Sequence, residues 1–325
     1  MEVLRSSPRM RMVVSDPGYA YSRPCFSPGG DRILFMRTPV SASAGTVARD
    51  NGSPWSLWTV PVEGGEMRPA LVDASLSATR PDWCPVSGRI VFTGIREGRP
   101  ELWLLDGDGG TPTRVDVGVL PDARFFYPSW FPDGKRLLVT DYSTHQVHAV
   151  DLEGGHARPL TDPAKVWAGM AVACCNAGNG ERVAFAGQLP GGRFHPGRNT
   201  IWIQEARGEA TPLDRLPGRM PAWSRMGDSL VFTAPRWRSW SRLDVRRFVR
   251  PPSTLYLQRM GPWPAAAGPA RPLTALRVHA SHAKWAPDGR RLVCNLGIRW
   301  GGPSGIGVID VAPSGQPRPS RITSL

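Results

Sequence analysis

The chain has 325 residues, and its 40 Lys and Arg outnumber its 27 Asp and Glu, which gives a formal net charge of +13 at pH 7. No stretch approaches the roughly 18 apolar residues that a membrane-spanning helix needs, and the first residues start no apolar run typical of a signal peptide. We therefore expect no membrane span and a cytoplasmic protein, or an exported one if the N-terminus has been trimmed.

From the N-terminus onward, one group of short strands recurs. In its first copy an apolar strand ends at Phe26, a turn follows at Gly30, and further strands cover 32–35, 57–60 and 67–71. The turn belongs to the Pro-Asp-Gly type, in which Pro presets φ and Gly tolerates a positive φ. Later copies supply second strands at 89–92 and 229–232, third strands at 102–105, 147–150, 201–203 and 255–257, and edge strands at 158–161 and 271–274.

The copies recur at a nearly constant period. Their turn glycines are Gly30, Gly88, Gly134, Gly180, Gly227 and Gly289, so the intervals are 58, 46, 46, 47 and 62 residues. A period of this length indicates a repeat architecture, no helical periodicity of useful length competes with it, and a unit of four strands makes a propeller blade. The sequence therefore predicts an all-β fold, a single six-bladed β-propeller of four-stranded antiparallel blades.

The predicted blades use almost the whole chain. We expect them at about 20–72, 73–118, 119–164, 165–214, 215–275 and 276–325. A propeller closes its ring, often by giving one terminal strand to the blade at the other end of the chain. Residues 8–15 are one candidate for that strand and residues 320–323 are the other, and the sequence does not choose between them.

The clearest copies of the repeat are residues 130–139, WFPDGKRLLV, and residues 285–294, WAPDGRRLVC. This pattern resembles the repeat of the TolB-type propellers, which also occurs in the propeller domains of prolyl-oligopeptidase relatives and of the tricorn protease. The resemblance covers roughly residues 20–320. It implies the fold and not a particular function, because such propellers host many unrelated activities. In the fourth copy residues 174–178, CCNAG, replace the usual aromatic residue and Pro-Asp turn. We expect neither the N-terminal domain of TolB nor the hydrolase domain of the peptidases.

Loop length predicts which face of the propeller is functional. If the strands of each blade are named a to d from the axis outward, the a–b and c–d turns share one face and the b–c and d–a loops share the other. The long segments are all b–c loops, at 37–54, 187–199, 233–253 and 295–305. Variable loops on a constant framework are typical of a binding side. We therefore expect function on the b–c/d–a face.

The mouth of the central channel is the first candidate site. The residue three positions before each inner-strand aromatic is predicted at the start of strand a, so these residues should meet at the axis. They are Arg23, Arg80, Tyr127, Met220 and His282. Two guanidiniums in such a ring suit a carboxylate or phosphate through forked hydrogen bonds. The alternative is that Arg23 and Arg80 brace neighbouring blades through loop carbonyls.

Two of the long loops combine arginine with tryptophan. Residues 236–250 hold Arg236, Trp237, Arg238 and Trp240 among six Arg and three aromatics, and the loop of predicted blade six holds Arg299 and Trp300. These six residues complete the predicted ligand-binding set. Such a segment suits a lid that packs its Trp side chains on the propeller, a lid over a ligand pocket, stacking on nucleic-acid bases or an anionic membrane surface.

Metal, cofactor and disulfide signals are weak. His145, Asp141, His195 and His279 share the b–c/d–a face by topology, yet their spacing matches no established metal motif, so we predict no metal. No catalytic triad signature, P-loop or dinucleotide fingerprint is present, and no cofactor is expected. The five Cys are odd in number and Cys174 is adjacent to Cys175, which argues against a disulfide framework. Cys25, Cys84 and Cys294 are predicted as small core residues.

Three functional classes stay open at this point. The first is a binding or interaction module of the TolB type, monomeric, that takes a small anionic ligand or an acidic protein partner. The second is an enzyme that uses the channel mouth on a small anionic substrate, and the third is a nucleic-acid-binding scaffold, which the sequence favours least. The basic excess fits an anionic partner, and it also fits the arginine usage of a GC-rich genome, since Lys occurs at three positions only.

Overall fold

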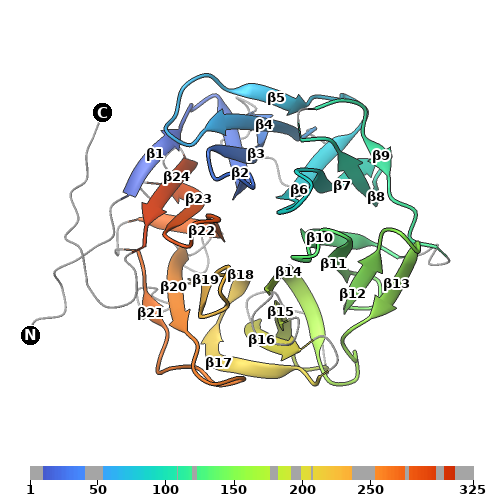
Figure 1. The fold of residues 1–325 in the computed structure, drawn as a ribbon, viewed down its shortest axis with the longest axis vertical. Helices are drawn as coiled ribbons and strands as arrows, with labels where there is room; N and C mark the ends of the chain where they lie inside the picture. The colour runs from blue at the N-terminus through green and yellow to red at the C-terminus, as the bar shows by residue number, and fades with distance from the viewer. Residues whose placement is uncertain are drawn as a thin grey trace, which may run out of the picture.

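The computed structural model describes residues 10–40, 54–107, 109–118, 123–175, 182–191, 199–205, 208–235, 253–274, 278–297 and 304–311. These residues form six antiparallel sheets of four strands each, arranged as blades around a central channel (Figure 1). The all-β six-bladed propeller that the repeat predicts is therefore confirmed.

The strands follow the chain in blade order. Blade one contains β2 (Tyr19–Phe26), β3 (Arg32–Pro39), β4 (Ser56–Pro61) and β5 (Arg68–Leu71). Blade two contains β6 (Ser77–Trp83), β7 (Ile90–Arg96), β8 (Arg99–Leu105) and β9 (Thr113–Arg114). Blade three contains β10 (Phe125–Trp130), β11 (Arg136–Asp141), β12 (Gln146–Asp151) and β13 (His156–Pro159).

The second half of the ring repeats this order. Blade four contains β14 (Trp167–Cys175), β15 (Arg182–Gln188), β16 (Thr200–Glu205) and β17 (Thr211–Pro217). Blade five contains β18 (Arg219–Trp223), β19 (Ser229–Pro235), β20 (Ser253–Arg259) and β21 (Arg271–Pro272). Blade six contains β22 (His279–Trp285), β23 (Arg291–Gly297), β24 (Ser304–Asp310) and, as its outer strand, β1 (Met10–Val14).

The N-terminal strand joins the last blade. β1 pairs antiparallel with β24, so the first strand of the chain completes the sheet built by its last three described strands. The competing segment, 320–323, lies outside the described residues. Asn295 on β23 links blade six to blade one. Its Nδ2 donates to the Tyr21 carbonyl at 2.6 Å, and its Oδ1 accepts from the Arg23 N–H at 3.0 Å. Blades six and one are thus joined by a side-chain amide whose donor and acceptor are both used.

Apolar side chains fill the space between neighbouring blades. Around Trp130, for example, Cys84 and Val91 come from blade two, whereas Leu137 and Val139 come from blade three. Cys25, Cys84 and Cys294 are buried free thiols, which agrees with their prediction as core residues. Burial raises the pKa of Cys294 to about 12 and also raises that of Cys25.

The inner-strand tryptophans are not equally buried. Trp130 and Trp223 are 4% and 6% exposed, whereas Trp83 and Trp285 are only half-buried. The indole of Trp83 faces Gly107, which has no side chain to cover it, and Trp285 borders a hollow between blades five and six.

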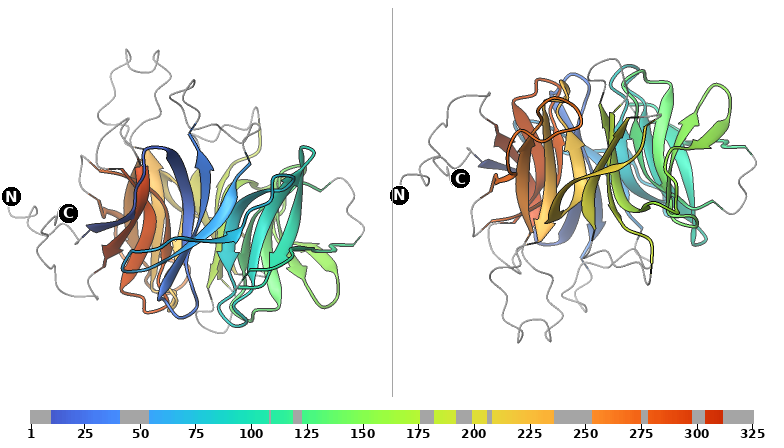
Figure 2. Two further views of the ribbon diagram at one scale, coloured as in Figure 1. Left: turned by 90° about the horizontal axis from the view of Figure 1, so that it is seen from above. Right: turned by 90° about the horizontal axis from the view of Figure 1, so that it is seen from below.

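The tight turns after the inner strands share one face. They follow β2, β6, β10, β18 and β22, and their glycines have φ of 66–74°. Side views show the strands running from one face of the ring to the other (Figure 2), so turns at equivalent places in antiparallel blades lie together. Gly180 lies outside the described residues. The b–c connections are on the opposite face, and much of them also lies outside the described part of the chain, including Arg236, Trp237, Arg238, Trp240, Arg299, Trp300 and His195.

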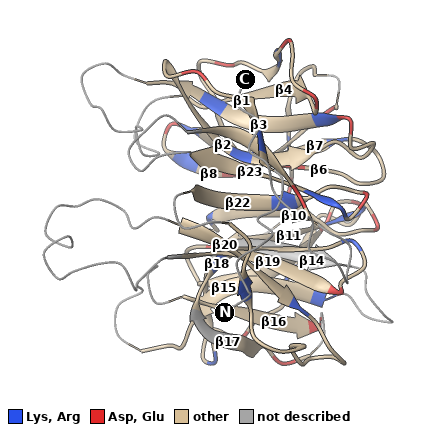
Figure 3. Ribbon diagram, turned by 90° about the vertical axis from the view of Figure 1, so that its left-hand side faces the viewer, with Lys and Arg blue, Asp and Glu red and all other residues tan. Residues whose placement is uncertain are grey.

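Charged residues of both signs are spread over the strands and turns of the described part (Figure 3). Several pair locally on the surface, such as Arg11 with Glu63 at 3.0 Å and Lys135 with Glu153 at 3.1 Å. Exposed pairs of this kind contribute little to stability. Among the described residues the structure contains no helix long and apolar enough to cross a lipid bilayer.

Candidate functional site in the central channel

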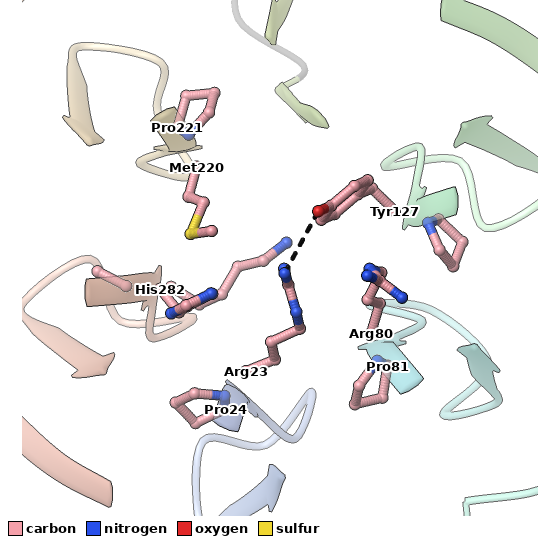
Figure 4. Close-up of a pocket in the computed structure, with 11 residues that line it drawn as sticks. Arg23, Pro24, Arg80, Pro81, Tyr127, Met220, Pro221 and His282 are labelled. Carbon is pink, nitrogen blue, oxygen red and sulfur yellow. Dashed lines mark hydrogen bonds between the residues drawn. The ribbon is translucent and has the colours of Figure 1, made fainter. Parts of the chain in front are cut away.

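The five predicted channel residues do come together. Arg23, Arg80, Tyr127, Met220 and His282 project from five inner strands and line one cavity at the axis (Figure 4). Each has a positive φ of 52–59° and sits where the pairing of strands a and b shifts register. A bulge re-aims the side chain it carries. The repeat therefore builds the site by placing a bulge at the same point of each of these blades.

The depth of these residues differs from the prediction. Arg23 is the fifth of the eight residues of β2, and Arg80 is the fourth of the seven residues of β6. β2 and β6 begin several residues before the predicted position because they pair with long second strands, as in Tyr19 opposite Pro39, whereas Met220 is the second residue of β18, close to its predicted position. Arg23 and Arg80 therefore lie within the channel and not at the start of their strands.

An aromatic ring lies close to both arginines. The guanidinium carbons of Arg23 and Arg80 are 4.7 and 4.8 Å from the centroid of the Tyr127 ring, and Arg80 is 4.8 Å from that of Phe126. Arg23 Nη2 also donates to the Tyr127 hydroxyl at 3.5 Å. Cation–π contacts of this kind attract partly desolvated cations. The two arginines are thus held near each other by aromatic surface.

A second tier lies two residues further along the same strands, and the sequence reasoning missed it. Its members are Cys25, Asp82, Ser129, Ala222 and Lys284, at equivalent positions of five blades. Lys284 Nζ pairs with Asp82 Oδ1 at 3.2 Å, and Asp82 Oδ2 accepts from the Ser129 hydroxyl at 3.0 Å. The same spacing argument, moved by two residues, would have found Asp82.

Several channel groups have displaced pKa values. Burial raises the pKa of Tyr127, but the Arg23 and Arg80 guanidiniums and a hydrogen bond with Tyr142 outweigh it and lower the pKa to about 8. Burial and the neighbouring Tyr127 raise the pKa of Tyr142. Burial, followed by Arg23 and other cationic neighbours, lowers the pKa of His282 well below its ordinary value. His282 is therefore neutral at pH 7, and the positive charge of the channel belongs to Arg23, Arg80 and Lys284.

We expect one phenol of the folded protein to ionise near pH 8. Because folding lowers the pKa of Tyr127 from 10.0 to about 8, its ionisation stabilises the folded state as the pH rises from about 8 towards 10. That contribution is lost as the pH falls through about 8. The test is the ultraviolet absorbance of tyrosinate in wild type and in Tyr127→Phe. Their difference should titrate with a midpoint near pH 8, and a midpoint at 10 or above would show that the arginines do not act on this phenol.

The space between these side chains is small. The cavity measures about 50 Å³, whereas a single buried water needs roughly 10–15 Å³ on this measure. It therefore holds a few waters or one small anionic group, and it is far smaller than the roughly 300–1,000 Å³ of a typical small-molecule pocket.

The weak metal candidates lie in separate environments. The Asp141 carboxylate accepts from the Ser143 and Thr144 hydroxyls and from the Arg124 N–H. His145 stacks on Trp167, and His279 Nδ1 accepts from the Ser253 N–H at 3.1 Å. Within the described residues no group of three or more His, Cys, Asp or Glu is placed to hold a metal ion.

Comparison with known proteins supports the fold. No family model matches the chain. The Tol-Pal system protein TolB of Anaeromyxobacter dehalogenans strain 2CP-1 is 31% identical over 124 residues, which covers 36% of this chain and 26% of that protein. The chain thus matches about a quarter of the length of this curated relative.

Solved structures agree over more of the chain. A putative TolB from Agrobacterium tumefaciens superposes with a TM-score of 0.61 at 15% identity and covers 95% of this chain and 99% of that one. TolB from Acinetobacter baumannii gives 0.55 at 15% identity and covers 90% and 63%. An oligogalacturonate lyase in complex with manganese gives 0.57 at 12% identity and covers 95% and 94%.

The protein is therefore a TolB-like six-bladed β-propeller. At these identities the solved structures share its fold alone, and that fold occurs in interaction proteins and in enzymes. The function therefore has to be argued from the site.

Proposed function

We propose that the protein is a binding module whose channel takes an anionic group from a small ligand or an acidic partner that approaches on the b–c/d–a face. The observation that carries this proposal is the cavity between Arg23, Arg80 and Tyr127. Three permanent cations border it, and Asp82 is the acid paired with one of them, Lys284. A carboxylate or phosphate suits the planar donors of arginine better than a neutral group does.

The size of the cavity narrows the proposal. About 50 Å³ accommodates a carboxylate or a phosphate but not a complete metabolite. The remainder of the ligand would then lie outside the ring, where the long b–c loops begin. Such a module binds the anionic group in its channel and contacts the remainder of the ligand with its b–c loops. It thus uses both predicted binding regions, the channel mouth and the long loops. The monomeric state and the cytoplasmic location stay predictions.

One observation favours a second candidate, an enzyme acting on a small anionic substrate. Tyr127, with its pKa lowered to about 8, and the neutral His282 line the same cavity, and titratable groups with displaced pKa values cluster at catalytic sites. The nucleic-acid alternative rests on residues 236–250, which lie outside the described part of the chain.

The test is calorimetric titration with inorganic phosphate and with acetate. We expect Arg80→Ala to weaken the binding of the anion roughly tenfold or more, because a hydrogen bond to a charged group contributes about 1.5–3 kcal/mol. Arg23→Ala should act in the same direction. The matched control is Arg89→Ala, which removes an arginine of the same blade that pairs with Asp106 at 3.9 Å on the a–b face.

Two results would decide between the alternatives. Unchanged anion binding in both Arg23→Ala and Arg80→Ala would reject the channel as the site and leave these residues as braces between blades. If the anion binds as expected, turnover of a carboxylate substrate that is lost in Tyr127→Phe while binding persists would favour the enzyme.

A further inference from the structure

A larger hollow lies on the opposite face, between blades five and six. It measures about 210 Å³ and is bordered by the turns after β18 and β22 and by the end of β20. Its lining includes Arg225, Met226, Arg259, Trp285 and Arg290. None of these residues belongs to the channel ring, and the two cavities share no lining residue.

The hollow coincides with a break in the repeat. In blades three, four and six the second strand begins with an arginine that lies opposite an acid at the end of the third strand: Arg136 with Asp151, Arg182 with Glu205 and Arg291 with Asp310. In blade five the partners are Ser229 and Arg259. The arginine has been replaced by a small residue, and the acid has been replaced by an arginine. Space and positive charge therefore appear together.

The adjacent turn breaks the repeat as well. Blades three and six have Pro-Asp-Gly at 132–134 and 287–289, whereas blade five has Arg-Met-Gly at 225–227. The substitution brings a second guanidinium and the thioether of Met226, which is 76% exposed. Arg290, from the blade-six turn, adds a third guanidinium at the rim.

The acids of the hollow already have partners in their own turns. Asp228 accepts from the Ser224 hydroxyl at 2.7 Å, and Asp288 accepts from Arg291 Nε at 2.9 Å. Within the described residues, no carboxylate lies within ion-pair distance of Arg225, Arg259 or Arg290; Arg259 Nη1 donates to the Ser229 hydroxyl at 3.1 Å. Three arginines against two acids leave the lining with a surplus of positive charge.

We propose that this hollow is a second ligand site, which binds a small organic phosphate with its anionic group among Arg225, Arg259 and Arg290 and its apolar part against Trp285 and Met226. Three guanidiniums from three elements offer more donors than one carboxylate accepts, whereas a phosphate brings up to two charges and three acceptor oxygens. A cavity of roughly 150 Å³ accommodates a benzene ring, so 210 Å³ accommodates a ring with a phosphate attached.

The probes are phenyl phosphate and inorganic phosphate, titrated calorimetrically into the full chain. We expect phenyl phosphate to bind about tenfold more tightly, because only its ring reaches Trp285 and Met226. The double variant Ser229→Arg/Arg259→Asp restores an arginine opposite an acid, as blades three, four and six have at these positions. It should fold, fill the hollow and bind phenyl phosphate at least tenfold more weakly, and near-ultraviolet circular dichroism checks that it folds.

Single variants keep the test decisive if the double variant does not fold. Arg259→Gln should weaken phenyl phosphate binding, whereas the exposed Arg158→Ala on blade three should leave it unchanged. The titrations are repeated in the Arg80→Ala background, where anion binding in the channel is weakened, and the effect of Arg259→Gln should persist there, which separates this site from the channel. Equal binding of phenyl phosphate by Arg80→Ala and by Arg80→Ala/Arg259→Gln would overturn the proposal.

Discussion

We expect Trp130→Ala to lower the free energy of unfolding by about 3–5 kcal/mol, the range measured for large buried aromatics. The indole is 4% exposed and fills the space between blades two and three. Its backbone N–H also donates to Asp82 Oδ2 at 2.9 Å, and its Nε1 donates to the Asp82 carbonyl at 3.3 Å. Because the apolar residues around the indole all come from blades two and three, no residue from elsewhere in the ring is placed to fill the cavity.

Denaturant unfolding measures this loss. Trp83→Ala is the matched comparison, since it truncates the same repeat position in blade two, where the indole is only half-buried. Its loss should be clearly smaller. A loss below about 1 kcal/mol for Trp130→Ala, or equal losses for the two variants, would mean that burial between blades does not set the contribution of these tryptophans.

The fold could be predicted from the repeat because several independent features of the sequence agreed. Tight turns, β-branched strands and a constant period all indicated the same unit, so the six-bladed fold could be predicted from the residues alone. The channel ring could be predicted for the same reason, since equivalent positions of a closed ring must meet at its axis. A Pro follows the inward residue in four of the five blades, at Pro24, Pro81, Pro128 and Pro221, but that proline alone does not predict the positive φ of the residue before it, which is uncommon for arginine.

Other features depend on contacts between residues far apart in sequence. The repeat could not show that Tyr127 lies against both arginines, because that depends on side-chain direction. Ring closure by β1 was a choice between two termini that only pairing with β24 resolves. The pair of Ser229 and Arg259 was visible as a departure from the repeat, but its meaning required the register of β19 and β20.

Breaking the ion pair inside the channel is the second change with a large expected effect. Asp82 and Lys284 are 202 positions apart in sequence, and their side chains are 13% and 31% exposed. Removing one partner of a buried pair typically costs about 3–5 kcal/mol. We expect Asp82→Ala to lower the free energy of unfolding by about 3 kcal/mol, at the low end because Lys284 keeps some contact with water.

The carboxylate has two roles that substitution can separate. Asp82→Asn keeps an oxygen that accepts from the Ser129 hydroxyl and the Trp130 N–H but removes the charge that faces Lys284. Its loss of stability should therefore be smaller than that of Asp82→Ala. Lys284→Met removes the cation, and in that background Asp82→Asn should cost less than in wild type, by the coupling energy of the pair. A double-mutant cycle from denaturant unfolding measures that coupling. Additive effects would show that Asp82 acts only through its hydrogen bonds to blade three, and the ion pair between blades two and six would then add no stability to the ring.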